Sequence, residues 1–328
     1  MTLYEARLLL KSPAIVTVRK TERGYVKPSS FIPGSTLRGA ILTALYRAGS
    51  MKEQDLEAEA RSPKLLTSAA FPVAEGRRTL PATPFIASCK LCGATLDLTR
   101  NAVEALQAGR DPEFPLLCPK DGGPLESLYS RPVYARDGRL RPFRLKTFRA
   151  TSVGISKERG SAVKGLLFDY EAITDGAEFW AWIVSPNDMQ MPSRLEVAVG
   201  RGQSRGFGWG ELNLRPVSQM PNLQKKVFVA LSPFTPWKEI AWESNNLKVS
   251  KILGRKSKVQ LGWDMVKKGL RPSVKLSKPG SMVVAELLHG EPPAFIAGLP
   301  VQVNESWVVG LNSLLTVDEY YRLMEVTG

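Results

Sequence analysis

Two short motifs place three cysteines and an aspartate at spacings that suit a metal ion. The first motif is CKLCG and the second is CPKDG. In each, a tight turn can bring two ligands onto one ion, as in a zinc knuckle, and the aspartate stands where a fourth cysteine would be expected. Because zinc accepts carboxylate oxygen beside thiolate sulfur, the set could complete a tetrahedral structural site. The candidate ligands are Cys89, Cys92, Cys118 and Asp121.

The alternative is a decayed zinc ribbon, which lost its metal together with its fourth ligand and is now held by packing. In either case the motifs lie in an insertion at residues 86–126 that we expect to be structural and not catalytic. An odd number of cysteines, two of them in a C-x-x-C, indicates metal ligation in a reducing compartment and not a set of disulfides.

The glycine-rich segment GRGQSRGFGWGEL, residues 200–212, could bind an anion. Glycine permits positive φ and lets backbone N–H groups approach a phosphate closely. Phe207 and Trp209 offer stacking surfaces or core anchors. We expect the loop to grip a nucleic-acid backbone through Arg201, Gly202, Gln203, Ser204, Arg205 and Gly206. The alternative is a glycine-rich bend that only makes a tight hairpin.

Two nucleotide-binding loops do not fit this segment. A dinucleotide-binding loop needs G-x-G-x-x-G at the start of a helix, but this segment leads into the alternating ELNLRPV, which predicts a strand. A P-loop needs G-K-[ST], which does not follow.

Catalytic residues are sparse. His289 is the only histidine, so a two-histidine ribonuclease site within the chain is excluded. Its position in ELLHGEPP, at the end of an apolar segment, indicates a surface or packing role. Asp169, Asp175 and Asp188 could take part in metal-dependent cleavage, but their spacing is typical of turns and strand ends. We therefore expect the protein to be noncatalytic.

The charge of the chain favours a polyanionic partner. A formal net charge of +14 and a pI of about 9.7 come from 45 Lys and Arg against 31 Asp and Glu. Nucleic acid is the first candidate for such a partner. Ten basic residues lie in each of the segments 131–164 and 248–278, against two and one acidic residues respectively. These segments predict a binding surface, and the alternative is a solvated, flexible surface.

A membrane partner is not expected. The longest apolar runs, such as 165–168 and 280–288, are far shorter than the roughly 20 residues that a spanning helix needs. The start MTLYEARLLLKSPAIVTV lacks the charge and cleavage pattern of a signal peptide, so we expect a cytoplasmic protein.

The elements that must position these groups indicate an α+β protein. Residues 5–18 predict a strand, and FIPGSTLRGAILTALYRAG predicts a turn and then a helix. Ser35 and Thr36 can cap this helix and Gly49 can end it. We expect the helix N-terminus to be free to face an anion. Further along, LLFDYEAITDGAEFWAWIV predicts two strands joined at Asp175-Gly176.

The second half of the chain echoes the first. LLLKSP at 8–13 matches VALSP at 229–233, and Pro-Gly-Ser occurs at 33–35 and again at 279–281. The same order of both matches predicts a duplicated domain, although matches this short also arise by chance. The boundary would lie in the Pro- and Ser-containing stretch 216–222.

Several segments resemble the RAMP superfamily of CRISPR-Cas effector proteins. IPGSTLRGAI, residues 32–41, resembles the family's segment at the start of the first helix, and GRGQSRGFGWGEL resembles its glycine-rich loop. LFDYEAITDGAEFWAWI and LGWDMVKKGLRPSVKLSKPGSMVV resemble one branch, the Csx-type subunit of type III-D complexes. The resemblance therefore touches most of the chain.

The resemblance implies a fold and a set of partners. The fold would be two ferredoxin-like (RRM-like) domains at residues 1–218 and 219–328, with the zinc-ribbon-like insertion in the first. The partners would be a CRISPR guide RNA, other effector subunits of the superfamily and the large type III subunit, with target RNA nearby. The subunit would hold the 5′ repeat-derived handle of the guide. GLPVQVNESWVVGL, where a second glycine-rich loop should be, has few glycines and no arginine, so we expect a structural second domain.

The resemblance also implies roles for residues. Ser35 and Arg38 would approach RNA phosphate at the start of the first helix. The loop would clamp the handle through Arg201, Gln203, Ser204 and Arg205. An arm over the guide would be formed by Lys157, Arg159 and Lys164. Two alternatives within the superfamily are a guide-processing endoribonuclease that uses His289 and a backbone subunit that cuts target RNA through an aspartate.

Overall fold

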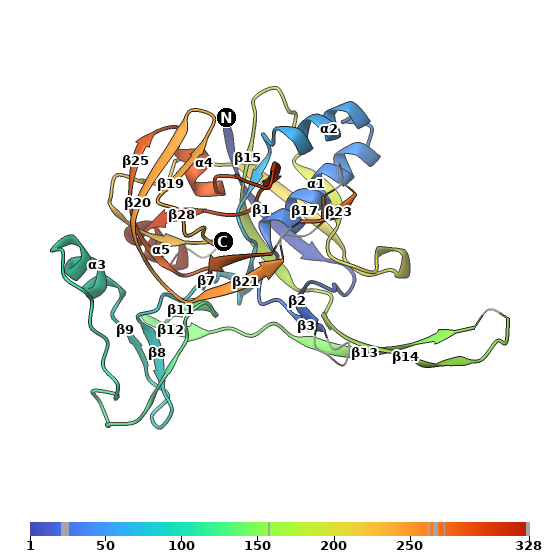
Figure 1. Ribbon diagram of the computed structural model, residues 1–328. Coiled ribbons are helices and arrows are strands. Elements are labelled where there is room, and N and C mark those ends of the chain that lie inside the picture. The colour runs from blue at the N-terminus through green and yellow to red at the C-terminus, as the bar shows by residue number, and fades with distance from the viewer. Residues whose placement is uncertain (21–25, 157, 261–262, 265–267, 272, 326–328) are drawn as a thin grey trace.

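The computed structural model is a mixed α/β structure with mostly antiparallel sheets and few helices. Figure 1 shows two bodies side by side, one formed mainly by the chain up to β17 and the other by the last third, and we call these two parts of the chain the first and the second half. Two projections leave them on opposite sides, one carrying α3 and the other formed by β13 and β14. The structure describes residues 1–328 except 21–25, 157, 261–262, 265–267, 272 and 326–328.

The first sheet has β1 at its centre, in the order β16-β17-β1-β15-β5-β6. Strands β17 and β15 pair antiparallel with the two edges of β1, and β4 adds to β15. The bounds are β1 Thr2–Leu10, β4 Leu66–Thr67, β5 Phe71–Ala74, β6 Arg77–Arg78, β15 Glu178–Ser185, β16 Arg194–Ala198 and β17 Trp209–Pro216. The strand predicted over 5–18 therefore begins earlier and ends at Leu10, before Pro13.

Helix α1 (Gly34–Arg47) covers one face of this sheet and α2 (Glu53–Arg61) follows it. Leu8 of β1 and Leu37 and Ile41 of α1 are buried in one core, and burial of each such side chain contributes about 1.5–3 kcal/mol. The helix ends as predicted at Gly49, whose φ of 74° lets Ser50 N donate to Leu45 O at 2.9 Å. The predicted cap is wrong, because Pro33 occupies the N-cap position and no side chain caps the helix.

The other face of the first sheet packs against the C-terminal half. Trp180 and Trp182 of β15 share a core with Phe228 and Phe234, so the two halves are not separate globules. The second sheet has the order β19-β20-β25-β18-β28. Its strands and the helices of this half are β18 Val227–Ala230, β19 Glu239–Trp242, β20 Asn245–Leu253, β25 Met282–His289, β28 Leu314–Thr316, α4 Pro292–Ala297 and α5 Val317–Glu325.

The two Pro-Gly-Ser segments enter different structures. The first opens helix α1, whereas the one at 279–281 leads into strand β25. Gly280 has φ of 88°, and a Cβ there would lie 2.2 Å from Ala82 O, so this glycine serves a close contact between backbones. The predicted equivalence of these segments is wrong. By contrast, LLLKSP and VALSP each end a strand, β1 and β18, that lies inside its sheet with a partner on both sides.

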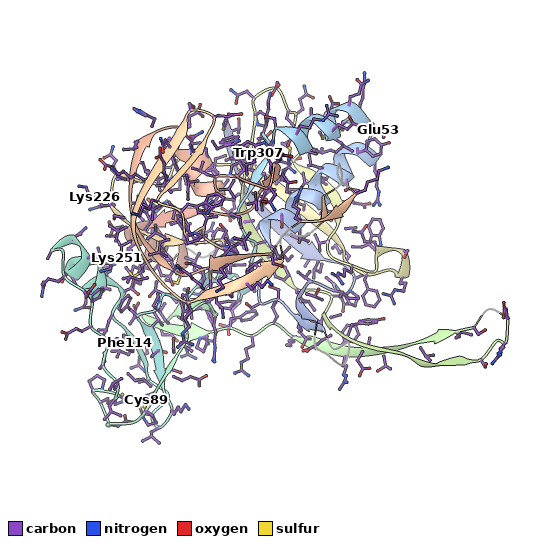
Figure 2. All side chains as sticks on the ribbon, viewed as in Figure 1. Glu53, Cys89, Phe114, Lys226, Lys251 and Trp307 are labelled. Carbon is purple, nitrogen blue, oxygen red and sulfur yellow. The ribbon has the colours of Figure 1, made fainter. Side chains whose placement is uncertain are left out.

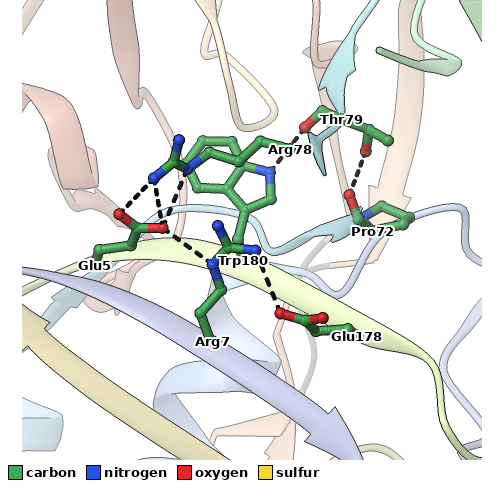
Figure 3. A network of polar contacts seen from close by, with 7 residues as sticks. All are labelled: Glu5, Arg7, Pro72, Arg78, Thr79, Glu178 and Trp180. Atoms are coloured by element: carbon green, nitrogen blue, oxygen red, sulfur yellow. Dashed lines mark hydrogen bonds and ion pairs between the residues drawn. The ribbon is translucent and has the colours of Figure 1, made fainter. Parts of the chain in front are cut away.

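A polar network lies on the face of the first sheet that points away from α1 (Figure 3). Arg78 donates to the Glu5 carboxylate from Nε and from Nη2, with Nη2–Oε2 at 2.7 Å, and Arg7 Nε donates to Glu5 Oε1 at 3.0 Å. Trp180 Nε1 donates to Thr79 O at 2.8 Å. Burial alone would raise the pKa of Glu5, but the hydrogen bonds and charges of the two arginines hold it below its usual value.

The first projection begins with β8 and carries a three-stranded sheet ordered β10-β8-β9 and helix α3. Cys89 and Phe114 lie on it, and an ion pair from its Asp111 reaches Lys251 on β20 (Figure 2). The elements of the projection and its base are β7 Leu80–Pro81, β8 Ile86–Cys89, β9 Thr95–Asp97, α3 Thr99–Gln107, β10 Leu125–Ser127, β11 Pro132–Arg136 and β12 Arg139–Pro142.

The second projection is the β13–β14 hairpin, hereafter the arm (Figure 1). The arm extends a sheet ordered β13-β14-β3-β2, and Asp175-Gly176 joins β14 to β15 as predicted, although these two strands belong to different sheets. No described helix has an apolar stretch long enough to cross a membrane. The remaining strands are β2 Thr17–Lys20, β3 Val26–Pro28, β13 Thr147–Ile155, β14 Ala162–Ile173, β21 Lys256–Gln260, β22 Trp263–Asp264, β23 Gly269–Leu270, β24 Ser273–Ser277, β26 Val301–Val303 and β27 Ser306–Val308.

Candidate nucleic-acid interface and metal centre

The glycine-rich loop connects the antiparallel strands β16 and β17, so it leads into a strand as predicted. Its two ends are bonded to the segment after β1: Arg201 N donates to Ile15 O at 3.0 Å and Gly208 N donates to Pro13 O at 2.7 Å. Gly200 and Gly208 have φ of 82° and 81°, and a Cβ at either would lie within 2.4 Å of a backbone oxygen. Only glycine fits at these two positions. The hairpin interpretation is therefore right about the local geometry.

The tip of the loop presents donors to solvent. A 3-10 turn (Gln203–Arg205, η1) is flanked by Gly202 and Gly206, both left-handed. Among the described residues, no acceptor is bonded to the backbone N–H groups of Gly202, Gln203 and Ser204. Successive free N–H groups of this kind form an anion-binding nest. The side chains of Arg201, Ser204 and Arg205 are exposed beside it.

Gln203 has a different role from the one predicted. Its side-chain amide is half-buried and donates to Ala198 O at 3.1 Å and to Gly200 O at 3.4 Å. It therefore closes the loop on itself and does not extend toward a ligand. These two hydrogen bonds tie the tip of the loop to the end of β16, where the loop begins.

Aromatic rings lie next to the loop. Tyr170 of the arm packs edge-on against Phe207, with ring centroids 5.6 Å apart, and the guanidinium of Arg205 lies 5.4 Å from the centre of the Tyr170 ring. Phe148 lies on the same face of the arm, because its partner Ala172 is two residues from Tyr170, and its side chain is 37 % exposed. Trp209 is 39 % exposed with Arg47 over its ring. Exposed aromatic rings beside guanidinium groups are typical of single-strand nucleic-acid surfaces.

The arm continues this surface away from the body (Figure 1). Arg159 is exposed in the turn at its tip, where its N–H donates to Ser156 Oγ at 3.3 Å. Lys157 lies outside the described residues, and Lys164 lies on β14 with a side chain that is outside them as well. Asp169 is bonded to Thr151 and Arg149 on the arm, and these hydrogen bonds lower its pKa.

Arg38 and Ser35 require a correction. The Arg38 guanidinium is largely buried, donates to Leu65 O at 2.8 Å and forms an ion pair with the buried Glu59. Burial lowers its pKa, and the charge of Glu59 opposes that shift. The N-terminus of α1 is also closed, since a Cβ on Gly34 would lie 2.4 Å from Thr67 O. Ser35 is half-buried there. An RNA phosphate cannot reach Arg38, because the side chain is held inside the fold.

The four candidate metal ligands are brought together. One ligand atom from each of Cys89, Cys92, Cys118 and Asp121 lies within 4.8 Å of the others. Cys89 and Cys118 are buried, while Cys92 and Asp121 are exposed. Two turns produce this arrangement, one closed by Gly93 N donating to Cys89 O at 3.1 Å and the other by Gly122 N donating to Cys118 O at 2.8 Å. The cluster could hold a metal ion.

The charges within this cluster favour a cation. A backbone hydrogen bond at Ala94 lowers the pKa of Cys92, but Asp121 and the neighbouring thiols raise it to about 11. The backbone N–H of Gly123 and the thiols lower the pKa of Asp121. The Cys92 thiol is therefore held in its neutral form beside a carboxylate, and a bound metal would favour its thiolate. Gly123 leaves room for this packing, since a Cβ there would lie 2.8 Å from Cys89 Sγ.

A model of the RAMP superfamily matches residues 8–211 of the chain. The chain belongs to the RAMP superfamily. The match runs from β1 to the strand that follows the glycine-rich loop, so it includes helix α1 and the arm.

Several solved structures are similar to this RAMP protein. A chain of the type III-B Cmr-β complex bound to cognate target RNA and AMPPnP is similar over 85 % of this chain and 86 % of its own, with 13 % identity and a TM-score of 0.50. A chain of a Csm1–Csm4 cassette with one ATP is 13 % identical over 97 % and 98 % of the two chains, with a TM-score of 0.39. Oligomeric Cmr4 from Pyrococcus furiosus is 12 % identical over 67 % and 100 %, with a TM-score of 0.30. A search of curated protein sequences returns no match.

The candidate catalytic residues of this RAMP protein do not converge. His289 is exposed at the end of β25, and no hydrogen bond of its side chain occurs among the described residues. Asp175 and Asp188 are exposed in turns, as their spacing indicated. Asp169 is bonded within the arm.

Three residues of the interface were not predicted from the sequence: Phe148, Tyr170 and Arg47. Tyr170 lies 37 positions from Phe207 in the chain, and only the pairing of the arm with the body brings the rings together. The segment that forms the arm is both aromatic and basic, and only its charge entered the prediction of a binding surface.

Proposed function

We propose that this RAMP protein is a guide-RNA-binding subunit of a type III CRISPR-Cas effector, in which the glycine-rich loop holds the 5′ repeat-derived handle of the CRISPR RNA. The observation that carries the proposal is the tip of the loop. Three backbone N–H groups free of described partners stand there between the exposed Arg201 and Arg205, and Arg205 lies over the Tyr170 ring. Phosphates would bind the nest and the arginines, and bases would stack on the aromatic rings.

The assembly part of the proposal rests on family and fold. The superfamily match and the likeness to a chain of an RNA-bound type III-B complex support a place among other RAMP subunits and beside the large type III subunit. The sequence resemblance favours the Csx-type branch. Handle binding requires one loop per chain, and the second half of the chain has no comparable glycine-rich segment.

We also propose that each half is a ferredoxin-like domain. The strand order β17-β1-β15-β5 in the first sheet and β28-β18-β25-β20 in the second both follow the order 4-1-3-2 of that fold, counted along each half. The halves differ in helices, because α1 follows the first strand of the first half and α4 precedes the last strand of the second. We propose zinc for the cysteine cluster, since three thiolates and a carboxylate suit this ion in a structural site.

The test of handle binding is a double substitution, Arg201→Ala with Arg205→Ala, in the full chain. Each single-strand phosphate contact adds about 0.7 to the slope of log affinity against log salt, so the slope should fall by about 1.4 and the affinity for a handle-bearing RNA by about tenfold. The matched control is Arg110→Ala with Arg215→Ala, two exposed arginines outside the loop. Equal affinities and slopes for the two variants would contradict the proposal.

The proposed role involves no cleavage. Incubation of the purified protein with repeat RNA should leave the RNA intact, with and without added magnesium. Cleavage that the His289→Ala variant abolishes would replace this proposal by a guide-processing ribonuclease. Metal-dependent cleavage of target RNA in the assembled complex would favour the backbone-subunit alternative.

A further inference from the structure

The β21–β24 hairpin in the C-terminal half has one apolar and one cationic face. Its register pairs Lys258 with Lys275 and Lys256 with Ser277. Because side chains alternate across a strand, the three lysines lie on the same face. Val259 and Val274 point to the opposite face and pack against the core. We call Lys256, Lys258 and Lys275 the lysine face.

The lysine face lacks compensating charge. All three lysines are exposed, and among the described residues none of them forms an ion pair. Two of the three stand directly opposite each other across the ladder, an arrangement of like charges that destabilises a sheet. The neighbouring Arg255 and Lys278 at the root of the hairpin are exposed cations as well.

The root of the hairpin is firmly held. Leu276 is fully buried, and Ser277 and Phe234 exchange two backbone hydrogen bonds of 2.9 Å. Lys278 N donates to Arg255 O at 3.1 Å, which closes the hairpin. Tyr129, at the base of the metal-ligand projection, shares a hydrogen bond of 2.7 Å with Ser281 Oγ. The lysine face is therefore fixed relative to both halves of the molecule, and a ligand would meet it already ordered.

We infer that the lysine face is a second contact for an RNA backbone, separate from the glycine-rich loop and independent of base sequence. Lysine ammonium groups are point charges that suit phosphates without selecting a base. An acidic protein surface is the other possible partner, but protein interfaces are depleted in lysine and have apolar or aromatic residues at their centre. The three side chains of the lysine face include no apolar or aromatic group.

This inference rests on the proposed function for the identity of the RNA, and it changes the role of the second half. We expected that half to be structural because it lacks a glycine-rich loop. The lysine face gives it an RNA contact of another type, with side-chain charge in place of backbone N–H groups. The guide would then touch both halves of one chain.

The test uses the full chain with Lys256→Gln, Lys258→Gln and Lys275→Gln combined, and a labelled single-stranded RNA that carries the handle. Anisotropy titrations at several salt concentrations should show a salt slope reduced by about 2 and an affinity reduced on the order of tenfold or more. Because the three lysines are exposed, we expect their substitution to leave the fold intact, and the melting temperature of the variant checks this. The matched control removes the same charge from exposed lysines that form no described ion pair, Lys64, Lys226 and Lys238.

The outcomes separate this inference from handle binding. A slope equal to that of the control variant would overturn the lysine face as an RNA contact. If the lysine variant has the salt slope of the control variant but no longer assembles into the effector complex, the lysine face contacts an acidic protein neighbour and not RNA. If the Arg201 and Arg205 variant binds like wild type while the lysine variant loses slope, handle binding by the loop fails and the lysine face stands. If both contacts are real and independent, their losses in log affinity should add.

Discussion

The segments that lead into the last strand of each sheet, β17 and β28, differ in what they contact. In the first half, the loop between β16 and β17 keeps its tip in solvent, with glycines at the positions where it meets Ile15 and Val199. In the second half, β26 and β27 are joined by Asn304 and Glu305, both at positive φ, and the chain then runs to Gly310. A Cβ on Gly310 would lie 2.4 Å from Ser35 N of helix α1.

The difference shows how one strand order can support two roles. Gly200 and Gly208 make their close backbone contacts at the base of the loop, so its tip stays free. Gly310 makes its close contact with the start of α1 and therefore joins the two halves. Gly310 also closes the helix N-terminus that an anion would otherwise use. Binding therefore depends on the site and not on the sheet that carries it.

Breaking the contact between the halves should have the largest effect on stability. Gly310→Ala places a Cβ against backbone at a φ of 77°, so we expect a loss of about 2–4 kcal/mol in the free energy of unfolding, measured by urea titration. Gly109→Ala is the control, because φ is 71° there but nothing lies within 4 Å, and about 1 kcal/mol is expected. Equal losses would mean that the close contact at Gly310 has no role.

The polar network behind the first sheet should contribute less. Glu5→Gln leaves Arg78, which is largely buried, without its counter-charge, and we expect a loss of about 2–3 kcal/mol at neutral pH. Glu57→Gln, which removes an exposed ion pair with Arg61, should change stability by about 0.5 kcal/mol or less. A Glu5 variant as stable as the Glu57 variant would contradict this assignment.

The network also predicts a dependence on pH. Because the folded-state pKa of Glu5 lies below its usual value of 4.5, its stabilisation is complete above that value and is lost as pH falls through the lower folded-state pKa. The wild-type protein should therefore lose more stability than Glu5→Gln between neutral and acid pH. Parallel stability curves for the two proteins would show that Glu5 is not the titrating group.

The metal site should affect the global fold least, because it lies on a projection outside the two sheets. Protein purified without added zinc should contain one zinc ion per chain, and a chelator should remove it while the main thermal transition changes little. Cys118→Ala should lose the ion, and Asp111→Asn, an exposed acid on the same projection, should keep it. A zinc content near zero would refute the site, and a Cys89→Ala variant that retained zinc would refute the ligand assignment.

Local features of this chain were predictable because they depend on near neighbours. Gly49 ends α1 with positive φ, and the glycine-rich segment leads into β17. The two cysteine motifs each fold into a tight turn. That the two turns lie together was predictable because their side chains are ligands for the same kind of metal ion. The equivalence of the two Pro-Gly-Ser segments failed because a short motif opens a helix or enters a strand according to what packs against it.

The sequence by itself determined the superfamily resemblance, the basic character of the chain and the position of the loop, because glycine spacing and charge are properties of the residues themselves. Only the tertiary structure decided which arginines are available. Arg38 looked like a phosphate ligand but is buried against Glu59, while Arg205 lies open over Tyr170. Burial and partners come from segments far apart in the chain, and the free energy of a charge depends on both.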